Sequence, residues 1–160
     1  NNQPLRGAKA TLFEGGIRVP CIIRWPGKIK AGTETNEVAW ALDLFPTICH
    51  FANVDTDGLT LDGKDISGLL TGQTPVGTRE LYWQLGPHAE LKRGRWSALR
   101  QGDWKYIQDA GGEEFLFDLK ADPYEKQNLT QSQAAKLTEL QERRDTLVKT
   151  LTPQVKSINP

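Results

Sequence analysis

The chain has 160 residues, the size of one ordinary domain or of one domain with part of another. Its 20 Lys and Arg balance 20 Asp and Glu, which argues against a basic surface for nucleic acid or anionic membranes. With 38% hydrophobic and 25% charged residues the chain is expected to fold, and apolar runs such as residues 19–23 are too short to cross a bilayer.

The first half of the chain predicts one strand. Residues 1–16 are rich in Gly and polar residues and read as a loop. Residues 17–25 are apolar and β-branched on both faces, which predicts a strand covered on both sides, as in an α/β sheet. Pro20 cannot donate to a ladder, so we expect this part of the strand at an edge or a bulge.

A helix is predicted next, over residues 40–53. Asp43 is its candidate N-cap, because a carboxylate accepts hydrogen bonds from the free N–H groups of the first turn. Apolar residues follow at helical spacing on one face. The Thr-, Pro- and Gly-rich stretch 72–77 is the best candidate for a boundary between two parts of the chain.

The second half predicts an antiparallel sheet packed by a C-terminal helix. Short aromatic-rich runs occupy residues 81–83, 96–100, 104–107 and 114–119, and turn residues at hairpin spacing separate the last three, so we expect about four strands. A helix is expected over residues 131–151, with Thr130 and Gln133 as a capping box and Pro153 as its stop. Its Leu stripe, broken only by Arg144, is expected to pack on one face of the sheet.

Residue patterns alone reveal no recognised catalytic motif. The sequence has no nucleophile elbow, phosphate-binding loop or zinc motif, and its two histidines, His50 and His88, fall in different predicted elements. His50 lies on an apolar helix and is interpreted as a structural residue.

The opening block nevertheless carries a specific motif. Residues 1–20 read NNQPLRGAKATLFEGGIRVP, and this block resembles a signature of the sulfatase family, particularly of the arylsulfatase B type. The similarity continues in order through the DLFPT stretch at residues 43–47, the ALRQGDWK stretch at 98–105 and the DPYE stretch at 122–125. It therefore extends over nearly the whole chain.

The resemblance implies an α/β parent enzyme with the alkaline-phosphatase-like sulfatase fold. Residues 1–75 would be the C-terminal end of its catalytic α/β domain, with the lysine loop, the strand and the helix. Residues 76–160 would be an α+β C-terminal subdomain of about four antiparallel strands and a terminal helix. The localisation expected from the family is periplasmic or secreted.

The resemblance also implies site residues. Lys9 would be catalytic, reaching the sulfate ester, where a fixed ammonium stabilises charge that grows in the transition state. Others would hold the loop rather than touch substrate: Arg6, Glu14, Gly15, Gly16 and Arg18. Four residues on or after the first strand of the second half would contact the substrate: Trp83, Gln84, His88 and Arg93. Aromatic faces stack on sugars, and Arg or His pairs with anions.

The family's nucleophile and metal ligands are expected elsewhere. The nucleophile is a formylglycine made from a C-x-P-x-R motif, and neither Cys21 nor Cys49 lies in that pattern. The ligands of the family's calcium ion would precede this sequence, so no metal ligand is assigned here. We therefore expect the C-terminal portion of a sulfatase that is inactive alone and acts on a sulfated carbohydrate or aryl sulfate together with the missing N-terminal part.

Two alternatives stay open. One is a non-catalytic carbohydrate-binding or interaction module built on the aromatic-rich sheet. The other is a phosphodiesterase or phosphonate hydrolase of the same superfamily. Without the other strands of an α/β sheet, residues 19–24 would expose a strand edge, so we further expect either self-association through them or a poorly ordered first half.

Overall fold

The computed structural model describes residues 2–86 and 94–156, with backbone alone for 152–156. Two of the expected substrate residues, His88 and Arg93, lie outside the described residues. The chain divides into two compact units. We call them the sheet unit, Asn1–Pro20 with Glu80–Pro160, and the helical unit, Cys21–Arg79.

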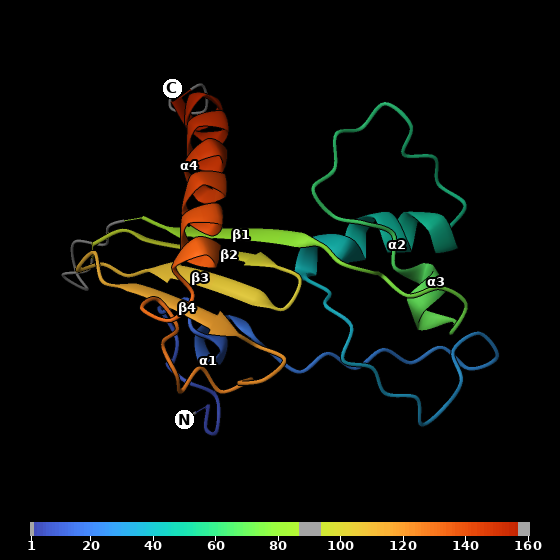
Figure 1. Cartoon of the computed structure of the whole chain (residues 1–160). Coiled ribbons are helices and arrows are strands. Elements are labelled where there is room, and N and C mark those ends of the chain that lie inside the picture. The colour runs from blue at the N-terminus through green and yellow to red at the C-terminus, as the bar shows by residue number, and fades with distance from the viewer. Residues whose placement is uncertain (1, 87–93, 157–160) are drawn as a thin grey trace. The chain divides into compact units, whose positions relative to one another are not determined.

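The sheet unit contains the four antiparallel strands that the sequence predicts. They are β1 (Glu80–Leu85), β2 (Trp96–Gln101), β3 (Trp104–Gln108) and β4 (Glu114–Asp118), in the order β1-β2-β3-β4 (Figure 1). Each strand pairs with the next along the chain, so short turns are sufficient to connect β2, β3 and β4.

The two faces of this sheet carry separate apolar clusters, as the two-residue period of a strand requires. Ala98, Ile107 and Phe117 belong to one cluster, on what we call the loop face. Leu99, Tyr106 and Leu116 belong to the other, on the helix face. All six side chains are fully buried, so both faces of the sheet are covered.

Helix α4 (Ala134–Lys156) covers the helix face (Figure 1). Its Leu140 is fully buried in that cluster, which confirms that the Leu stripe packs on the sheet. Arg144 interrupts the stripe and donates to Gln108 at 2.7 Å. The predicted helix ends are wrong. The helix starts after the Thr130 box, whose Thr130 N–H instead donates to the Asn128 side chain, and it continues past Pro153.

The N-terminal segment covers the loop face of the sheet. Leu12 and Phe13 are buried in its cluster, and the short helix α1 (Glu14–Ile17) follows directly. The strand predicted over residues 17–25 does not form. A strand apolar on both sides needs partners on its edges and cover on its faces. The single sheet of the described residues ends at β1 and β4 without it, and Ile22 is 93% exposed.

The helical unit contains the 3-10 turn η1 (Ala41–Asp43) and the helices α2 (Leu44–Phe51) and α3 (Ser67–Leu70). The helix predicted over residues 40–53 is thus confirmed in shorter form, but Asp43 makes no side-chain cap to α2. His50 Nδ1 lies 2.9 Å from Asp65 Oδ2, and the imidazole is 58% exposed. No helix in the described ranges is long and apolar enough to span a membrane.

Asp43 instead organises the helical unit through a buried ion pair. Its carboxylate accepts two hydrogen bonds from Arg79, at 2.6 and 2.8 Å, and two more from the backbone N–H groups of Trp40 and Lys64. The Asp43 carbonyl accepts from the hydroxyl of Thr47, whose oxygen in turn accepts the N–H of Ile66. The DLFPT stretch therefore connects three separate segments.

Candidate active-site loop

Lys9 lies at the tip of a tight turn in the N-terminal segment. The Ala8 carbonyl accepts hydrogen bonds from the Thr11 N–H at 3.1 Å and from the Thr11 hydroxyl at 2.8 Å. Ala10 has a φ of 76°, the left-handed conformation that the third position of a type II turn requires. The Lys9 side chain is exposed and has no ion pair within the described ranges. We call residues 5–13 the Lys9 loop.

The end of the Lys9 loop is fixed in the core. Leu12 is 1% exposed, and the Phe13 ring makes edge contacts with Trp96, Phe115 and Phe117 at centroid distances of 5.6, 5.2 and 6.3 Å. Aromatic pairs of this geometry add to the stabilisation that burial itself supplies. The exposed lysine therefore lies a few residues from one of the best-packed parts of the molecule.

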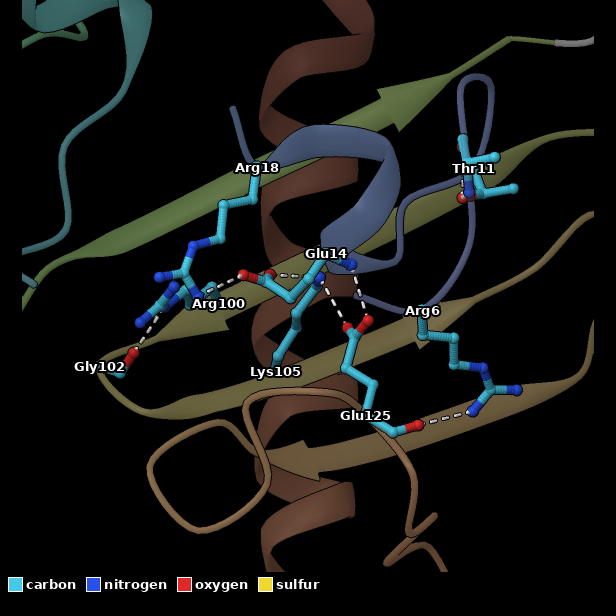
Figure 2. A network of polar contacts seen from close by, with 9 residues as sticks. Arg6, Thr11, Glu14, Arg18, Arg100, Gly102, Lys105 and Glu125 are labelled. Atoms are coloured by element: carbon cyan, nitrogen blue, oxygen red, sulfur yellow. Dashed lines mark hydrogen bonds and ion pairs between the residues drawn. The ribbon is translucent and has the colours of Figure 1, made fainter. Parts of the chain in front are cut away.

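Directly after the Lys9 loop, an ion cluster is buried between the N-terminal segment and the sheet (Figure 2). Lys105 Nζ, on strand β3, lies 2.7 Å from Glu14 Oε1 and 2.8 Å from Glu125 Oε1. The second oxygen of Glu125 accepts the backbone N–H of Glu14 at 2.6 Å. All three side chains are at most 4% exposed. We call Glu14, Lys105 and Glu125 the buried triad.

The triad contains two carboxylates but only one ammonium group. Burial raises the pKa of Glu125, and the nearby Glu14 carboxylate acts in the same direction. The ion pair with Lys105 and the hydrogen bond from Glu14 offset this only in part. Arg18 Nη1, half exposed, lies 3.9 Å from Glu14 Oε2 and supplies some of the missing positive charge.

Glu125 also contacts the beginning of the Lys9 loop. Its carbonyl accepts a hydrogen bond from Arg6 Nη1 at 3.0 Å, as Figure 2 shows. The Arg6 guanidinium lies 4.2 Å from the centroid of the Phe13 ring, a cation–π distance. Glu125 itself has a φ of 55°, which is uncommon for a residue with a side chain. One residue of the C-terminal part thus contacts the chain on both sides of Lys9.

Gly15 and Gly16 allow α1 to lie against the Lys9 loop. A Cβ on Gly15 would be 2.5 Å from the Arg6 carbonyl oxygen, and one on Gly16 would be 2.1 Å from that of Thr11. The Gly15 N–H donates to the same Arg6 oxygen at 2.7 Å, and its carbonyl accepts from the Asn2 side chain. Both glycines are required by close backbone approach rather than by a positive φ.

Two of the residues expected at the substrate, Trp83 and Gln84, follow one another on β1 and lie on opposite faces of the sheet. Trp83 is half-buried against the loop-face cluster, the side that carries the Lys9 loop. Gln84 is exposed and accepts a long hydrogen bond from Tyr82, a residue of the helix face. The structure therefore places Trp83 on the loop side and Gln84 away from it.

Sequence reasoning did not single out Lys105 or Glu125, although both lie in stretches that resemble the family. One signal was available for Lys105. It alternates with Trp104 and Tyr106 on a strand, so it points to the face opposite theirs, which is largely apolar and where a lysine needs a carboxylate partner. Nothing local indicates that Glu125 is that partner.

The described residues do not fit the calcium ion of the family. No group of three or more His, Cys, Asp or Glu side chains that could hold a metal occurs in the part of the chain that the structure describes. The buried carboxylates Asp43, Glu14 and Glu125 are each bound by Arg, Lys or backbone N–H groups. Both Cys21 and Cys49 are free thiols outside the family's nucleophile motif.

The sheet unit thus combines an antiparallel four-stranded sheet, a terminal helix packed on one face and the Lys9 loop packed on the other. Residues 8–153 match the family described as "N-sulphoglucosamine sulphohydrolase, C-terminal", so the chain belongs to this family of sulfatase C-terminal domains. The predicted sulfatase family is confirmed.

Individual relatives agree. Arylsulfatase A of Bos taurus is 36% identical over 80% of this chain and 29% of its own length. Steryl-sulfatase of Rattus norvegicus is 45% identical over 52% of this chain and 15% of its own. The chain thus spans less than a third of these relatives.

Solved structures show the same fold. The crystal structure of Ps i-CgsB has a TM-score of 0.79 at 27% identity, over 92% of this chain and 32% of that one. BT4656, solved in complex with its substrate D-glucosamine-2-N,6-O-disulfate, has a TM-score of 0.59 at 26% identity, over 87% of this chain and 29% of its own. These neighbours confirm the predicted alkaline-phosphatase-like fold class.

Proposed function

We propose that the protein containing this domain hydrolyses sulfate esters and that Lys9 contacts the ester in that reaction. The observation that carries the proposal is the exposed Lys9, in the family's motif, on a turn whose two flanks are both bound to the C-terminal part of the sheet unit. The family's nucleophile, and the side chains that bind its calcium ion, would come from the rest of the catalytic domain.

The chemistry favours a lysine at this position. A sulfate monoester carries negative charge on its non-bridging oxygens, and breaking the S–O bond adds charge to the leaving oxygen. An ammonium held at that oxygen stabilises the transition state more than the bound substrate. Because the Lys9 loop is fixed at both ends, little reorganisation is needed when the charge develops.

A sulfated carbohydrate is the substrate class that the neighbours support. Ps i-CgsB has been crystallised with k-i-k-neocarrahexaose, and BT4656 with a sulfated glucosamine. Trp83, on the loop face, could offer a ring to a sugar. The contacts of Gln84, His88 and Arg93 with substrate remain predictions.

The direct test is Lys9→Ala in the longer protein, assayed with an aryl sulfate. Loss of one preorganised charged contact should lower kcat by roughly one to three orders of magnitude. Lys120→Ala, which removes another exposed lysine of the sheet unit, is the matched control and should leave the rate unchanged. An unaltered rate in the Lys9 variant would remove this residue from the site.

The rival binding-module function predicts a different property. It requires the 160-residue chain to bind a sulfated oligosaccharide alone, whereas our proposal predicts no turnover and weak or no binding. Isothermal titration calorimetry with such a sugar separates the two. A phosphonate or phosphodiester hydrolase would instead be detected by comparing kcat/KM for those esters and for an aryl sulfate in the longer protein.

Exposed apolar side chains of the helical unit support the proposal that the rest of the catalytic domain covers this unit. Several large apolar side chains are exposed there, among them Ile22, Phe45 and Ile48 at 93%, 53% and 63%. Exposed apolar surface of this kind marks an interaction site. The rest of the catalytic domain would cover it, and the chain alone should self-associate, which analytical ultracentrifugation measures.

A further inference from the structure

The buried triad is costly to retain for stability alone. Lys105 is fully buried on a sheet face that is apolar apart from Arg100, its partner on β2, and moving an ammonium and two carboxylates out of water has a large desolvation penalty. Well-packed hydrophobic residues often replace such ion pairs with no loss of stability. What hydrophobic residues cannot supply is a set of directed bonds.

The directed bonds of this site meet on either side of Lys9. Before the lysine, Arg6 Nη1 donates to the carbonyl of Glu125. After it, Glu14 is bound through its backbone N–H by Glu125 and through its carboxylate by Lys105. Lys105 belongs to β3 and Glu125 to the segment after β4, so every one of these bonds connects the N-terminal segment with the C-terminal part of the sheet unit (Figure 2).

We propose that Lys105 and Glu125 are positioning residues for the sulfatase reaction: through the buried triad, the C-terminal sheet holds the Lys9 loop in the conformation in which the ammonium meets the ester. The inference rests on the proposed function of Lys9. It assigns to the C-terminal subdomain a part in the rate of the reaction, although neither residue touches substrate.

Catalysis is sensitive to such positioning. A displacement of about 1 Å, caused by a change away from the reacting atoms, can lower a rate by about 100-fold. A turn such as residues 8–11, with a left-handed Ala10, depends on its surroundings to stay in one conformation. The bonds from Glu125 and Lys105 to residues on each side of this turn supply that constraint.

The test is a double-mutant cycle in the longer protein. Lys105→Met and Glu125→Gln are each made in the natural background and in the Lys9→Ala background, and kcat and KM are measured with an aryl sulfate. If the triad acts through Lys9, each change should lower kcat by about 10- to 100-fold when Lys9 is present. In the Lys9→Ala background the same changes should lower kcat by less than about threefold.

Leu140→Ala is the control for general destabilisation. It creates a cavity on the helix face, away from the triad, and its effect on kcat should be small and equal in both backgrounds. Hydrogen exchange of the peptide that spans residues 5–16 supplies a readout independent of activity. It should become faster in Lys105→Met and Glu125→Gln and stay unchanged in Leu140→Ala.

Each outcome decides between the proposals. Equal fold-losses of kcat in both backgrounds, or unchanged exchange in residues 5–16, would overturn the positioning role and leave the function of Lys9 intact. A normal rate in Lys9→Ala alone would overturn the proposed function instead. If Lys105→Met does not fold, Glu125→Gln, which keeps the Lys105–Glu14 ion pair, decides the question by the same criteria.

Discussion

The sheet unit and the helical unit each contain a buried ionic site, but they differ in charge balance and in what surrounds it. In the helical unit one guanidinium meets one carboxylate, Arg79 with Asp43. In the sheet unit one ammonium is shared by two carboxylates. The sheet unit packs its site against a large apolar core, whereas Ile66 is the one large apolar side chain buried among residues 21–79.

Because of this difference in charge balance, the pKa values of Asp43 and Glu125 shift in opposite directions. Burial alone would raise the pKa of Asp43, but the hydrogen bonds from Arg79, Lys64 and Trp40, with the charge of Arg79, together hold it below its ordinary value. For Glu125 burial is the larger effect, and its pKa is raised. A balanced pair stabilises the charged carboxylate, and a surplus carboxylate favours the protonated form.

The helical unit should therefore depend on its ion pair more than on apolar burial. Arg79→Met leaves the Asp43 charge buried without a partner and should cost about 3–5 kcal/mol. The loss of unfolding free energy is measured by urea unfolding of the 160-residue chain, with hydrogen exchange in residues 21–79 as the probe of the helical unit.

Arg143→Met is the matched control for Arg79→Met. Arg143 also makes two hydrogen bonds to a carboxylate, that of Glu80, but its side chain is 45% exposed. Solvent and salt screen such a pair, so the cost should be about 0–1 kcal/mol. Equal costs for the two variants would show that burial does not distinguish these pairs.

Truncation of an apolar side chain should destabilise the sheet unit more than the helical unit. Leu140→Ala in the sheet unit removes a fully buried side chain and should cost about 2–5 kcal/mol. Ile48→Ala in the helical unit, at a side chain that is 63% exposed, should change the unfolding free energy by no more than about 0.5 kcal/mol. The midpoints of urea unfolding test this, and a large loss in Ile48→Ala would show that the helical unit has an apolar core.

The smallest expected effect is a difference in acid response. Because the folded pKa of Asp43 is lowered, its stabilisation is present above the ordinary value of 3.8 and is lost as the pH falls through the folded pKa. Because that of Glu125 is raised, its contribution is fully present below the ordinary value of 4.5 and is lost as the pH rises through the folded pKa.

Between neutral pH and about 4.5, acidification should therefore stabilise the sheet unit slightly and leave the Asp43 site unchanged, and stronger acid should weaken the helical unit. Hydrogen exchange of each unit as a function of pH measures both responses. Glu125→Gln should abolish the first response, and if the response persists in this variant it comes from another group.

Much of the sheet unit could be predicted because its determinants are local. Alternation along β2, β3 and β4 and the Gly- and Asp-containing turns between them are short-range patterns, and the Leu spacing of α4 is equally local. The motif around Lys9 likewise identified the family from consecutive residues. These features depend on neighbours within about one turn or one hairpin.

The tertiary structure alone decided which surfaces meet. Residues 17–25 have the composition of a buried strand, but without strands beside them in the described sheet their backbone groups have no ladder to join, so this prediction was wrong. The partnership of Glu14, Lys105 and Glu125 joins positions far apart in the chain, and no periodicity encodes it. Local sequence specifies the elements, whereas the pairing of buried charges is settled only when the packed chain removes water from around them.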